Sequence, residues 1–424
     1  MYVEIHEDSE HRATKRAGCA ADLFTSSQPG LPDVRCYTRS GSIELMSARS
    51  GVRHATANGN PSKRDRPVLV TGASGHLGAN LVRRLLDDGY PIRVLLREGT
   101  DPAAVEGLAV ECVFGDLRDF PATRAAVAGC GRIYHCAAKL STIEGDARHQ
   151  REIYECNVIG TQHLLRAARE ARVERVVVTG SFSAVGYDLD APSAPSNETM
   201  QFYPFERSMP YERSKVLVEH ECLKAVIDGL DVVVATCCAI IGGNDFRPSR
   251  LGRTLCDFVN GNLRAYLRGG FEFVAARDIV EAHLLCMHKG RTGHKYIFST
   301  EFLMLDELLD LFTEISGVAG PRRRLPAPLM LACAEMASAY LSRFHPGVQQ
   351  RLTPGAIRLL RKCRHADLTK ARTELGYRPT SIRTAVEEAY AFHYARGAIH
   401  HAAARAPSAP VGSGPAVAHR MALP

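Results

Sequence analysis

The stretch Val68-Leu-Val-Thr-Gly-Ala-Ser-Gly-His-Leu-Gly78 passes from a short apolar run through three spaced glycines into an amphipathic segment. A strand that turns through a glycine-rich loop into a helix is typical of the start of a dinucleotide-binding βαβ unit. Gly72 permits the tight turn, Gly75 lets the backbone approach a pyrophosphate, and Gly78 lets the helix pack close to the sheet. The helix start supplies free N–H groups, and the predicted phosphate site is completed by Ser74, His76 and Leu77.

Strand-like and helix-like segments alternate after this loop, which predicts βαβ units and a parallel sheet with right-handed crossovers. We therefore expect an α/β fold, a Rossmann-type doubly wound parallel sheet with a smaller, mostly helical C-terminal substrate lobe. Strands are predicted over 68–70, 92–96, 110–114, 133–136, 175–178 and 232–236, and helices over 77–88, 150–171, 211–228, 278–289, 305–316, 329–341 and 380–394.

The same alternation sets the expected domain boundaries. Residues 1–66 are polar, rich in Ser, Arg and Gly and without periodicity, which predicts a disordered extension. The NAD(P)-binding Rossmann domain is expected over 67–243. The substrate-binding lobe is expected over 244–398, with some of its segments returning to the Rossmann domain. The Ala/Pro/Ser-rich tail over 399–424 is also expected to be disordered.

The composition is that of an ordinary globular protein, with 45% hydrophobic residues, 23% charged residues and a net charge of +7. The basic clusters at 322–324 and 361–364 are interpreted as solvated surface, so no nucleic-acid partner is expected. The 13 cysteines form no CxxC pair and no metal-type spacing with His, which predicts reduced thiols, no metal site and a cytoplasmic protein.

No run of residues reaches the roughly 20 apolar positions of a membrane span. The nearest one, at 325–341, is interrupted by Glu335. We expect this segment to pack on the protein, with a helix that rests on a membrane as the alternative.

Two positions at strand ends bear on the cofactor. Arg97 follows the second predicted strand, where an acidic residue would bind the ribose hydroxyls of NAD. A guanidinium suits a 2′-phosphate, so NADP is favoured over NAD, although Glu98 stands beside it. Asp116, followed by Leu117, ends the third strand, where an adenine amino group would lie. Spacing alone equally allows Asp116 to cap the helix that begins near Asp119.

Tyr211 and Lys215 lie four residues apart in one predicted helix, so they share a face. A phenol with a pKa near ~10 is a poor base at neutral pH, but a nearby ammonium stabilises the phenolate and lowers that pKa. The pair is therefore expected to exchange a proton with a substrate hydroxyl or carbonyl. Ser181, at the carboxyl end of the fifth strand, is expected to hold the substrate oxygen. Ser183 is the reserve choice, and capping of the turn is the alternative role for both serines.

Together these motifs resemble the extended short-chain dehydrogenase/reductase family of the NAD-dependent epimerase/dehydratase type, over 67–395. The family's order is kept by TGASGHLG at 71–78, GDL at 115–117, HCAA at 135–138, NVIGT at 157–161, the serine strand and the YxxxK pair. Within the family, the chain is most similar to the dihydroflavonol-4-reductase-like and 3β-hydroxysteroid-dehydrogenase-like branch. The segments 242–248, 258–262, 277–278 and 374–379 carry that likeness.

The resemblance implies roles residue by residue. It makes Ser181, Tyr211 and Lys215 catalytic, with Lys215 also binding the nicotinamide ribose. Asn157 would have a structural or proton-relay role, of which the structural one is favoured. A homodimer formed through the helices at 150–171 and 211–228 is implied as well. The cofactor would be held by Gly72, Gly75 and Gly78 at the pyrophosphate, by Asp116 at the adenine, and by Ala137 and Ala138 along the cleft.

The chain departs from the family pattern near the expected nicotinamide site. Cys237 stands where the family usually has a proline after the sixth strand, and Gly180 replaces a common serine. Residues 1–66 have no counterpart in the family.

Three reactions share this scaffold. A sugar-nucleotide dehydratase needs an Asp–Glu pair directly after the catalytic hydroxyl, where this chain has Phe182 and Ser183, so that reaction is excluded. Arg97 and the apolar segment 329–341 favour an NADP(H)-dependent oxidoreductase that interconverts a hydroxyl and a ketone on a small, apolar substrate. A nucleotide-sugar epimerase is the alternative, since a diphosphate would suit Arg250, Arg253, Arg268 and Arg277. A non-catalytic NADP-sensing protein is the alternative of another class, and the intact Tyr–Lys pair argues against it.

Overall fold

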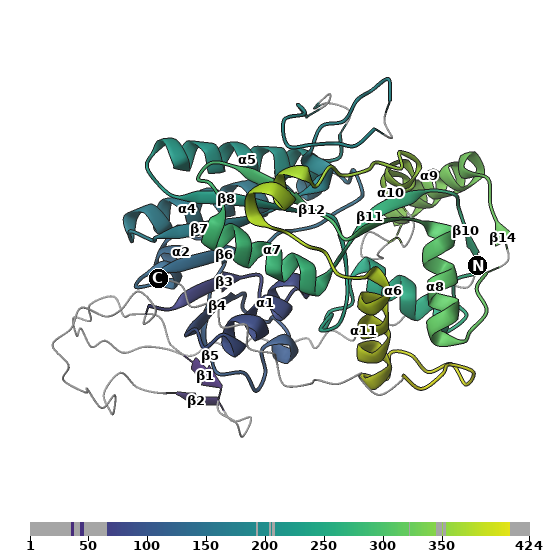
Figure 1. Cartoon of the computed structure of the whole chain (residues 1–424), viewed down its shortest axis with the longest axis horizontal. Coiled ribbons are helices and arrows are strands. Elements are labelled where there is room, and N and C mark those ends of the chain that lie inside the picture. Colours follow the sequence, from purple (N-terminus) through teal and green to yellow (C-terminus); the bar gives the residue numbers. More distant parts are fainter. Residues whose placement is uncertain are drawn as a thin grey trace, which may run out of the picture. The chain divides into compact units, whose positions relative to one another are not determined.

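Seven parallel strands form the central sheet of the computed structural model, in the order β12-β8-β7-β6-β3-β4-β5 (Figure 1). The strand order reverses between β3 and β6, which in such sheets marks the ligand crevice. The bounds are Val68–Thr71 (β3), Ile92–Leu96 (β4), Val110–Phe114 (β5), Arg132–His135 (β6), Arg175–Ser181 (β7), Val232–Cys237 (β8) and Lys295–Phe298 (β12). The structure describes residues 35–37, 43–45, 66–191, 194–202, 205, 208–321, 323–344, 350 and 353–407.

The predicted α/β class and parallel sheet are confirmed, and six of these strands were predicted. The seventh, β12, was missed. Most of the N-terminal extension lies outside the described residues, so the disorder predicted for residues 1–66 stays a prediction. Two short strands in it, β1 (Arg35–Tyr37) and β2 (Ile43–Leu45), pair with each other, and β1 pairs antiparallel with β5.

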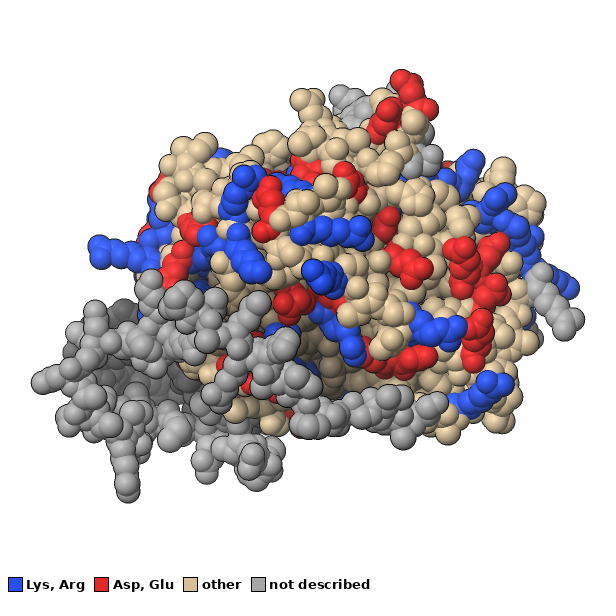
Figure 2. All heavy atoms as spheres, viewed as in Figure 1, with Lys and Arg blue, Asp and Glu red and all other residues tan. Residues whose placement is uncertain are grey.

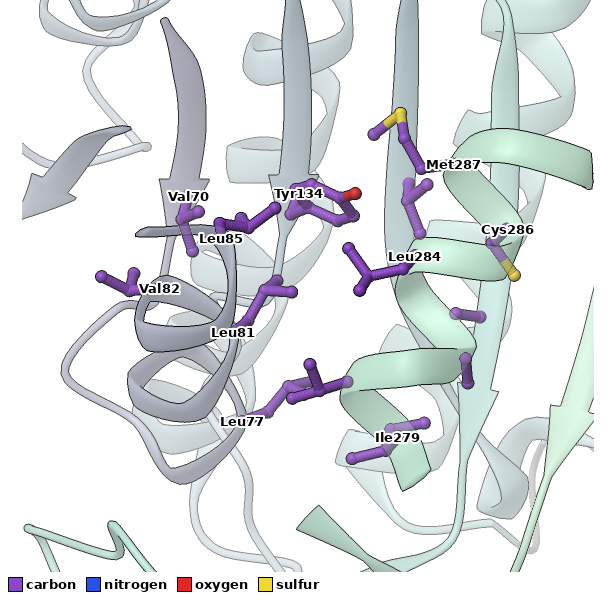
Figure 3. Packing of buried hydrophobic residues seen from close by; sticks show 14 of the residues in the cluster. Val70, Leu77, Leu81, Val82, Leu85, Tyr134, Ile279, Leu284, Cys286 and Met287 are labelled. Carbon is purple, nitrogen blue, oxygen red and sulfur yellow. The ribbon is translucent and has the colours of Figure 1, made fainter. Parts of the chain in front are cut away.

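Helices cover both faces of the sheet. Helices α1 (His76–Asp87) and α7 (Ala276–Lys289) bury apolar side chains against one face, and α2 (Phe120–Val127), α4 (Gly160–Glu170) and α5 (Pro210–Ile227) against the other. In Figure 3, Leu81 and Leu85 of α1 face Leu284 of α7 across Tyr134 of β6. Burying each such side chain contributes roughly 1.5–3 kcal/mol, so this packing holds the start of α1 firmly on the sheet.

The helix predicted over 150–171 is interrupted. It consists of α3 (Ala147–Tyr154), one wider π-helical turn at Glu155–Ile159 (η2), and α4. Such turns occur often at functional sites. The turn contains Asn157, and this irregularity was not predicted.

The predicted helical character of the C-terminal lobe is confirmed, and the lobe also has strands that were not predicted. It contains a three-stranded sheet, in the order β13-β11-β9, and two short paired strands, β10 and β14. The strand bounds are Ala239–Ile241 (β9), Ala265–Tyr266 (β10), Gly270–Ala275 (β11), Glu301–Met304 (β13) and Arg323–Arg324 (β14). The helices are Arg250–Val259 (α6), Leu305–Ser316 (α8), Ala327–Phe344 (α9), Pro354–Arg361 (α10) and Ile382–Ala395 (α11), with short turns at Pro102–Ala104 (η1), Phe182–Ala184 (η3) and Ala371–Leu375 (η5).

The lobe extends past the expected boundary at residue 398. Ile399 is buried in the lobe core, and the backbone N–H of Arg405 donates to the carbonyl of Ser316 at 2.9 Å. The residues from 408 on lie outside the described part of the chain, so the predicted disorder of the far tail is untested. The strand β12, which lies between lobe segments in the sequence, pairs with β8 of the large sheet. Within the described residues, no helix combines the length and the apolar character needed to cross a membrane.

Candidate active site

The glycine loop between β3 and α1 has the geometry of a phosphate cradle. Gly72 adopts φ of +74°, and a Cβ there would lie 2.6 Å from the backbone nitrogen of Ala137. A Cβ on Gly78 would overlap the carbonyl of Gly72, so the helix approaches the loop closely only with glycine there. Gly75 is the N-cap and has no side chain to bond the first N–H groups of α1. Those N–H groups and the positive end of the helix dipole therefore suit a pyrophosphate.

The side chains after Gly75 point away from the cradle. His76 hydrogen-bonds the carbonyl of Gly243 at 3.0 Å, and Asn80 donates to the same oxygen at 3.0 Å. Leu77 is buried in the core beside α7. The phosphate site predicted at His76 and Leu77 would therefore use their backbone groups, while their side chains fix α1 to the rest of the molecule.

A cavity of about 650 Å³ lies at the carboxyl ends of β4 and β5. Arg97 and Asp116, both predicted as cofactor residues, line it together with Ser74. Asp116 forms a salt bridge of 2.7 Å with Arg118, whose hydrogen bonds hold the pKa of that carboxyl below its usual value. Asp119, rather than Asp116, caps α2 by accepting from the N–H of Ala122, so Asp116 is free of that capping role.

The cavity residues that sequence reasoning missed include Arg118, Phe246 and Arg247. The last two come from the loop after β9, far away in sequence. The guanidinium of Arg83 on α1 lies 4.6 Å from the centre of the Phe246 ring. The likeness of the segment 242–248 to the family was the one sign in the sequence that these residues have a function. Nothing in that segment indicated a position beside Arg97.

Tyr211 and Lys215 lie in the first turns of α5, where Tyr211 is half-buried and Lys215 is buried. Lys215 is 5% exposed, and its ammonium donates to the carbonyl of Thr179 at 2.8 Å. Burial raises the pKa of Tyr211 above its ordinary value, and a hydrogen bond with Ser181 lowers it in part. Burial also lowers the pKa of Lys215. The shift of the Tyr211 pKa is thus upward rather than the expected lowering by Lys215: its main cause is desolvation of the phenolate, and the Lys215 ammonium is hydrogen-bonded to Thr179.

Ser181 and Ser183 lie together at the end of β7, with their hydroxyl oxygens 2.8 Å apart. The Ser181 hydroxyl also accepts from the N–H of Ser183 at 3.4 Å, so it caps the turn as well as contacting Tyr211. The turn-capping role predicted as the alternative for Ser181 is therefore present, and its role in holding a substrate oxygen stays a prediction.

The loop after Ser181 is fastened by Arg364. This guanidinium is 6% exposed and donates to the carbonyls of Val185 and Gly186 at 2.9 Å each. It also lies 4.6 Å from the centre of the Phe182 ring. Burial lowers its pKa to about 10. The interpretation of 361–364 as solvated surface is therefore wrong for Arg364, whose partners lie far away in the sequence.

Asn157 connects the π-helical turn to two neighbouring segments. Its amide donates to the carbonyl of Lys139 at 3.1 Å and to the hydroxyl of Ser214 at 2.9 Å, and its oxygen accepts from the N–H of Lys139 at 2.7 Å. Ser214 precedes Lys215 on α5. These contacts are those of a residue that positions α5, which agrees with the structural role favoured for Asn157.

Ala137 and Ala138, predicted to line the cofactor cleft, belong to the segment directly after β6. Ala137 is half-buried beside Gly72, and Ala138 is exposed. Cys237, at the position of the missing proline, donates its thiol to the carbonyl of Gly180 at 3.5 Å. A Cβ on Gly180 would lie 2.7 Å from the hydroxyl oxygen of Thr236, so the neighbouring strand leaves room only for glycine there.

Comparison with known proteins gives a consistent result. The model of the NAD dependent epimerase/dehydratase family matches residues 68–298. Sterol demethylase protein B of Methylococcus capsulatus is 43% identical over 78% of this chain and 99% of its own length. A 4-hydroxy-2-methyl-3-oxo-4-farnesyl-3,4-dihydroquinoline-1-oxide ketoreductase of Stigmatella aurantiaca is 27% identical over 73% of this chain and 91% of its own. The crystal structure of gox2253 is 29% identical, with a TM-score of 0.68 over 79% of this chain and all of that one.

Proposed function

The chain belongs to the NAD-dependent epimerase/dehydratase family, and from this premise we propose that it is an NADP(H)-dependent reductase or dehydrogenase. It interconverts a hydroxyl and a ketone on a small, apolar substrate. The observation that carries the proposal is the grouping at the carboxyl edge of the sheet, where Tyr211 shares a hydrogen bond with Ser181 and the buried Lys215 follows four residues later on α5. Carbonyl reduction needs a proton donor at this place, at the carboxyl edge of the sheet.

The residues divide the work of carbonyl reduction. The cofactor, when bound, supplies the hydride that adds to the carbonyl carbon. Ser181 donates a hydrogen bond that holds the carbonyl oxygen, and Tyr211 transfers its phenolic proton to that oxygen, which becomes the hydroxyl. Lys215 stabilises the resulting phenolate until Tyr211 regains a proton. The reverse sequence oxidises the alcohol.

The preference for NADP is supported by the cavity at the strand ends. Arg97 and Arg247 both line it, and two guanidinium groups suit a 2′-phosphate. Asp116 would repel that phosphate, but its salt bridge with Arg118 compensates its charge. NAD is the alternative cofactor.

The apolar character of the substrate is supported by the relatives. One is named for sterol demethylation, and the name of the other places a farnesyl group on the ketone that it reduces. The arginines that would favour a nucleotide sugar are on the surface, and Arg277 forms an ion pair with Glu388.

A homodimer through the helices α3, α4 and α5 is proposed as well. Ile227 and Leu223 on α5 are 84% and 49% exposed, and Tyr154 on α3 is 45% exposed. Large apolar side chains exposed on the helices of the expected interface support this proposal. Sedimentation velocity of Ile227→Glu tests this proposal: a monomer is expected where the wild type is a dimer.

The test of the reaction is NADPH oxidation with a panel of hydrophobic ketones. Tyr211→Phe is expected to lower kcat by about 10²–10⁴-fold while NADPH binding, followed by fluorescence, stays unchanged. Ser181→Ala is expected to lose more activity than its matched control Ser183→Ala. Equal rates for wild type and Tyr211→Phe would refute the catalytic assignment. Turnover of a nucleotide sugar without release of NADP⁺ would indicate an epimerase instead.

A further inference from the structure

The outer side of α9 is apolar along its whole length. Leu329, Met336, Tyr340 and Phe344 are 52%, 66%, 56% and 61% exposed, and Cys333 between them is also exposed. These positions recur every three or four residues, so they form one continuous line on the helix surface. We call this line the α9 stripe.

The stripe is separate from the face that packs on the lobe. The inward side of α9 uses Ala334, which is buried, and Met330 and Leu331, which are partly buried, against Ile357 and Leu360 of α10. The helix is therefore apolar on two opposite sides. A surface helix of a globular protein ordinarily has one apolar side, and a contiguous exposed apolar patch marks an interaction site.

The surroundings of the stripe are strongly basic. The sequence from 321 to 362 contains seven arginines, one lysine and a single acidic residue, Glu335. The charge of Glu335 is compensated by Arg358 at 2.8 Å. Arg323, Arg324 and Arg343 are exposed, and Arg324 lies 3.6 Å from Asp306 of α8. In Figure 2, Lys and Arg side chains gather at the upper right edge of the molecule, over the region that Figure 1 labels α9 and β14.

We propose that the α9 stripe docks on the surface of an anionic lipid bilayer. An apolar line flanked by arginines is the pattern of a helix that lies in the interface plane, with its apolar side among the acyl chains and its cations at the headgroups. Tyr340 and Phe344, whose rings lie 5.1 Å apart, supply aromatic groups of the kind enriched at this level of a bilayer.

The charge distribution favours a bilayer over a second copy of the chain. Two copies joined stripe to stripe would bring two basic surfaces together, and like charges at an interface are unfavourable. A bilayer of anionic lipid offers both an apolar interior and negative headgroups.

The docking proposal does not depend on which reaction the protein catalyses. One consequence does rest on the proposed function: the lobe that would hold an apolar ketone is then also the part of the molecule in contact with the bilayer where such a ketone dissolves.

The test is co-sedimentation of the full chain with vesicles of phosphatidylcholine alone and of phosphatidylcholine with phosphatidylglycerol. We expect binding to the mixed vesicles that weakens as salt rises. Met336→Glu combined with Tyr340→Glu is expected to lower the partition coefficient by about tenfold or more. The control is Tyr394→Glu, which puts one such charge on a 36% exposed tyrosine of α11 in the same lobe, and it should leave binding unchanged.

The basic residues are tested separately. Arg323→Glu combined with Arg324→Glu is expected to remove the preference for vesicles with phosphatidylglycerol. The partition coefficient on the mixed vesicles should fall by about fivefold or more for each arginine replaced. Unchanged NADPH binding and thermal unfolding show that each variant is folded. Failure of the folded wild type to bind mixed vesicles would overturn the proposal, as would equal binding by the Met336/Tyr340 variant. Self-association of the wild type that this variant abolishes, without vesicle binding, would instead make the stripe an interface between copies.

Discussion

The pKa values of the titratable groups around Tyr211 and around Arg97 are shifted by different physical causes. Around Tyr211, the largest cause of each pKa shift is burial. Burial raises the pKa of Tyr211 and lowers the pKa of Lys215. It also lowers the pKa of His135, which is 3% exposed, to about 3. Around Arg97, Asp116 and Arg118 shift each other's pKa values mainly by hydrogen bonds, with side chains 31% and 41% exposed.

This difference suits the residues around Tyr211 to proton transfer and the residues around Arg97 to the choice between NADP and NAD. Desolvation changes which protonation state exists, and solution salt hardly alters it, as proton transfer requires. Exposed guanidinium groups keep their charge and attract a phosphate through a field that salt screens. Mutations around Tyr211 should therefore alter turnover, and mutations around Arg97 should alter which cofactor binds.

The largest effect is expected around Tyr211. Lys215→Met removes the cation that stabilises the Tyr211 phenolate after proton transfer, so kcat for ketone reduction should fall by about 10²–10⁴-fold. Steady-state kinetics with saturating NADPH measures this. The control is Lys295→Met, because Lys295 is paired with Glu219 at 2.9 Å and belongs to β12. A loss of similar size in both variants would show a general structural effect.

The pH profile tests the same residues without mutation. Because burial raises the pKa of Tyr211, the phenol keeps its proton at a pH where a solvated tyrosine, with a pKa near ~10, would lose it. The kcat/KM for reduction should therefore not fall between neutral pH and about pH 10 through loss of this acid. A fall that begins near pH 7–8 would mean that Lys215 lowers the pKa after all, and that the residues around Tyr211 and around Arg97 are less different than proposed.

An effect of intermediate size is expected for Arg364, which belongs to the C-terminal lobe and holds the loop after Ser181. Arg364→Met leaves the carbonyls of Val185 and Gly186 without their donor, and about 1–3 kcal/mol is lost for each buried group left unsatisfied. We expect the free energy of unfolding to fall by about 2–4 kcal/mol, with a loss of kcat as the Ser181 loop relaxes. Denaturant unfolding measures this. Arg361→Met, at an exposed neighbouring position, should change the free energy by less than about 0.5 kcal/mol.

The residues concerned also show what a sequence can predict. The glycine loop was predictable because its geometry depends on consecutive residues: Gly72, Gly75 and Gly78 act within one strand–turn–helix unit. The spacing of Tyr211 and Lys215 on one helix is equally local. In contrast, the burial of Arg364 depends on carbonyls 178 and 179 residues earlier in the chain, and no local pattern indicates it.

The same reasoning explains the missed elements. Strand β12 has four residues, and it is held by pairing with β8 at the sheet edge rather than by a pattern of its own. Phe246 and Arg247 reach the Arg97 cavity only because β9 and the loop after it fold back toward α1. The direction of the Tyr211 pKa shift also could not be predicted from the sequence, because it depends on how completely the surrounding chain excludes water.

The smallest effect is expected around Arg97, where it also distinguishes the cofactors. Arg97→Ala should raise the KM for NADPH by about fivefold and Arg247→Ala by about two- to threefold, because each exposed guanidinium contributes about 1 kcal/mol or less to holding a phosphate. The KM for NADH should stay unchanged in both variants, and Arg268→Ala, at another exposed position, should change neither value. Raising the salt concentration toward 1 M should reproduce the loss for NADPH alone, since the screening length then falls to about 3 Å. If Arg247→Ala weakened both cofactors equally, Arg247 would act on the adenosine they share, and the selection of NADP would depend on Arg97 alone.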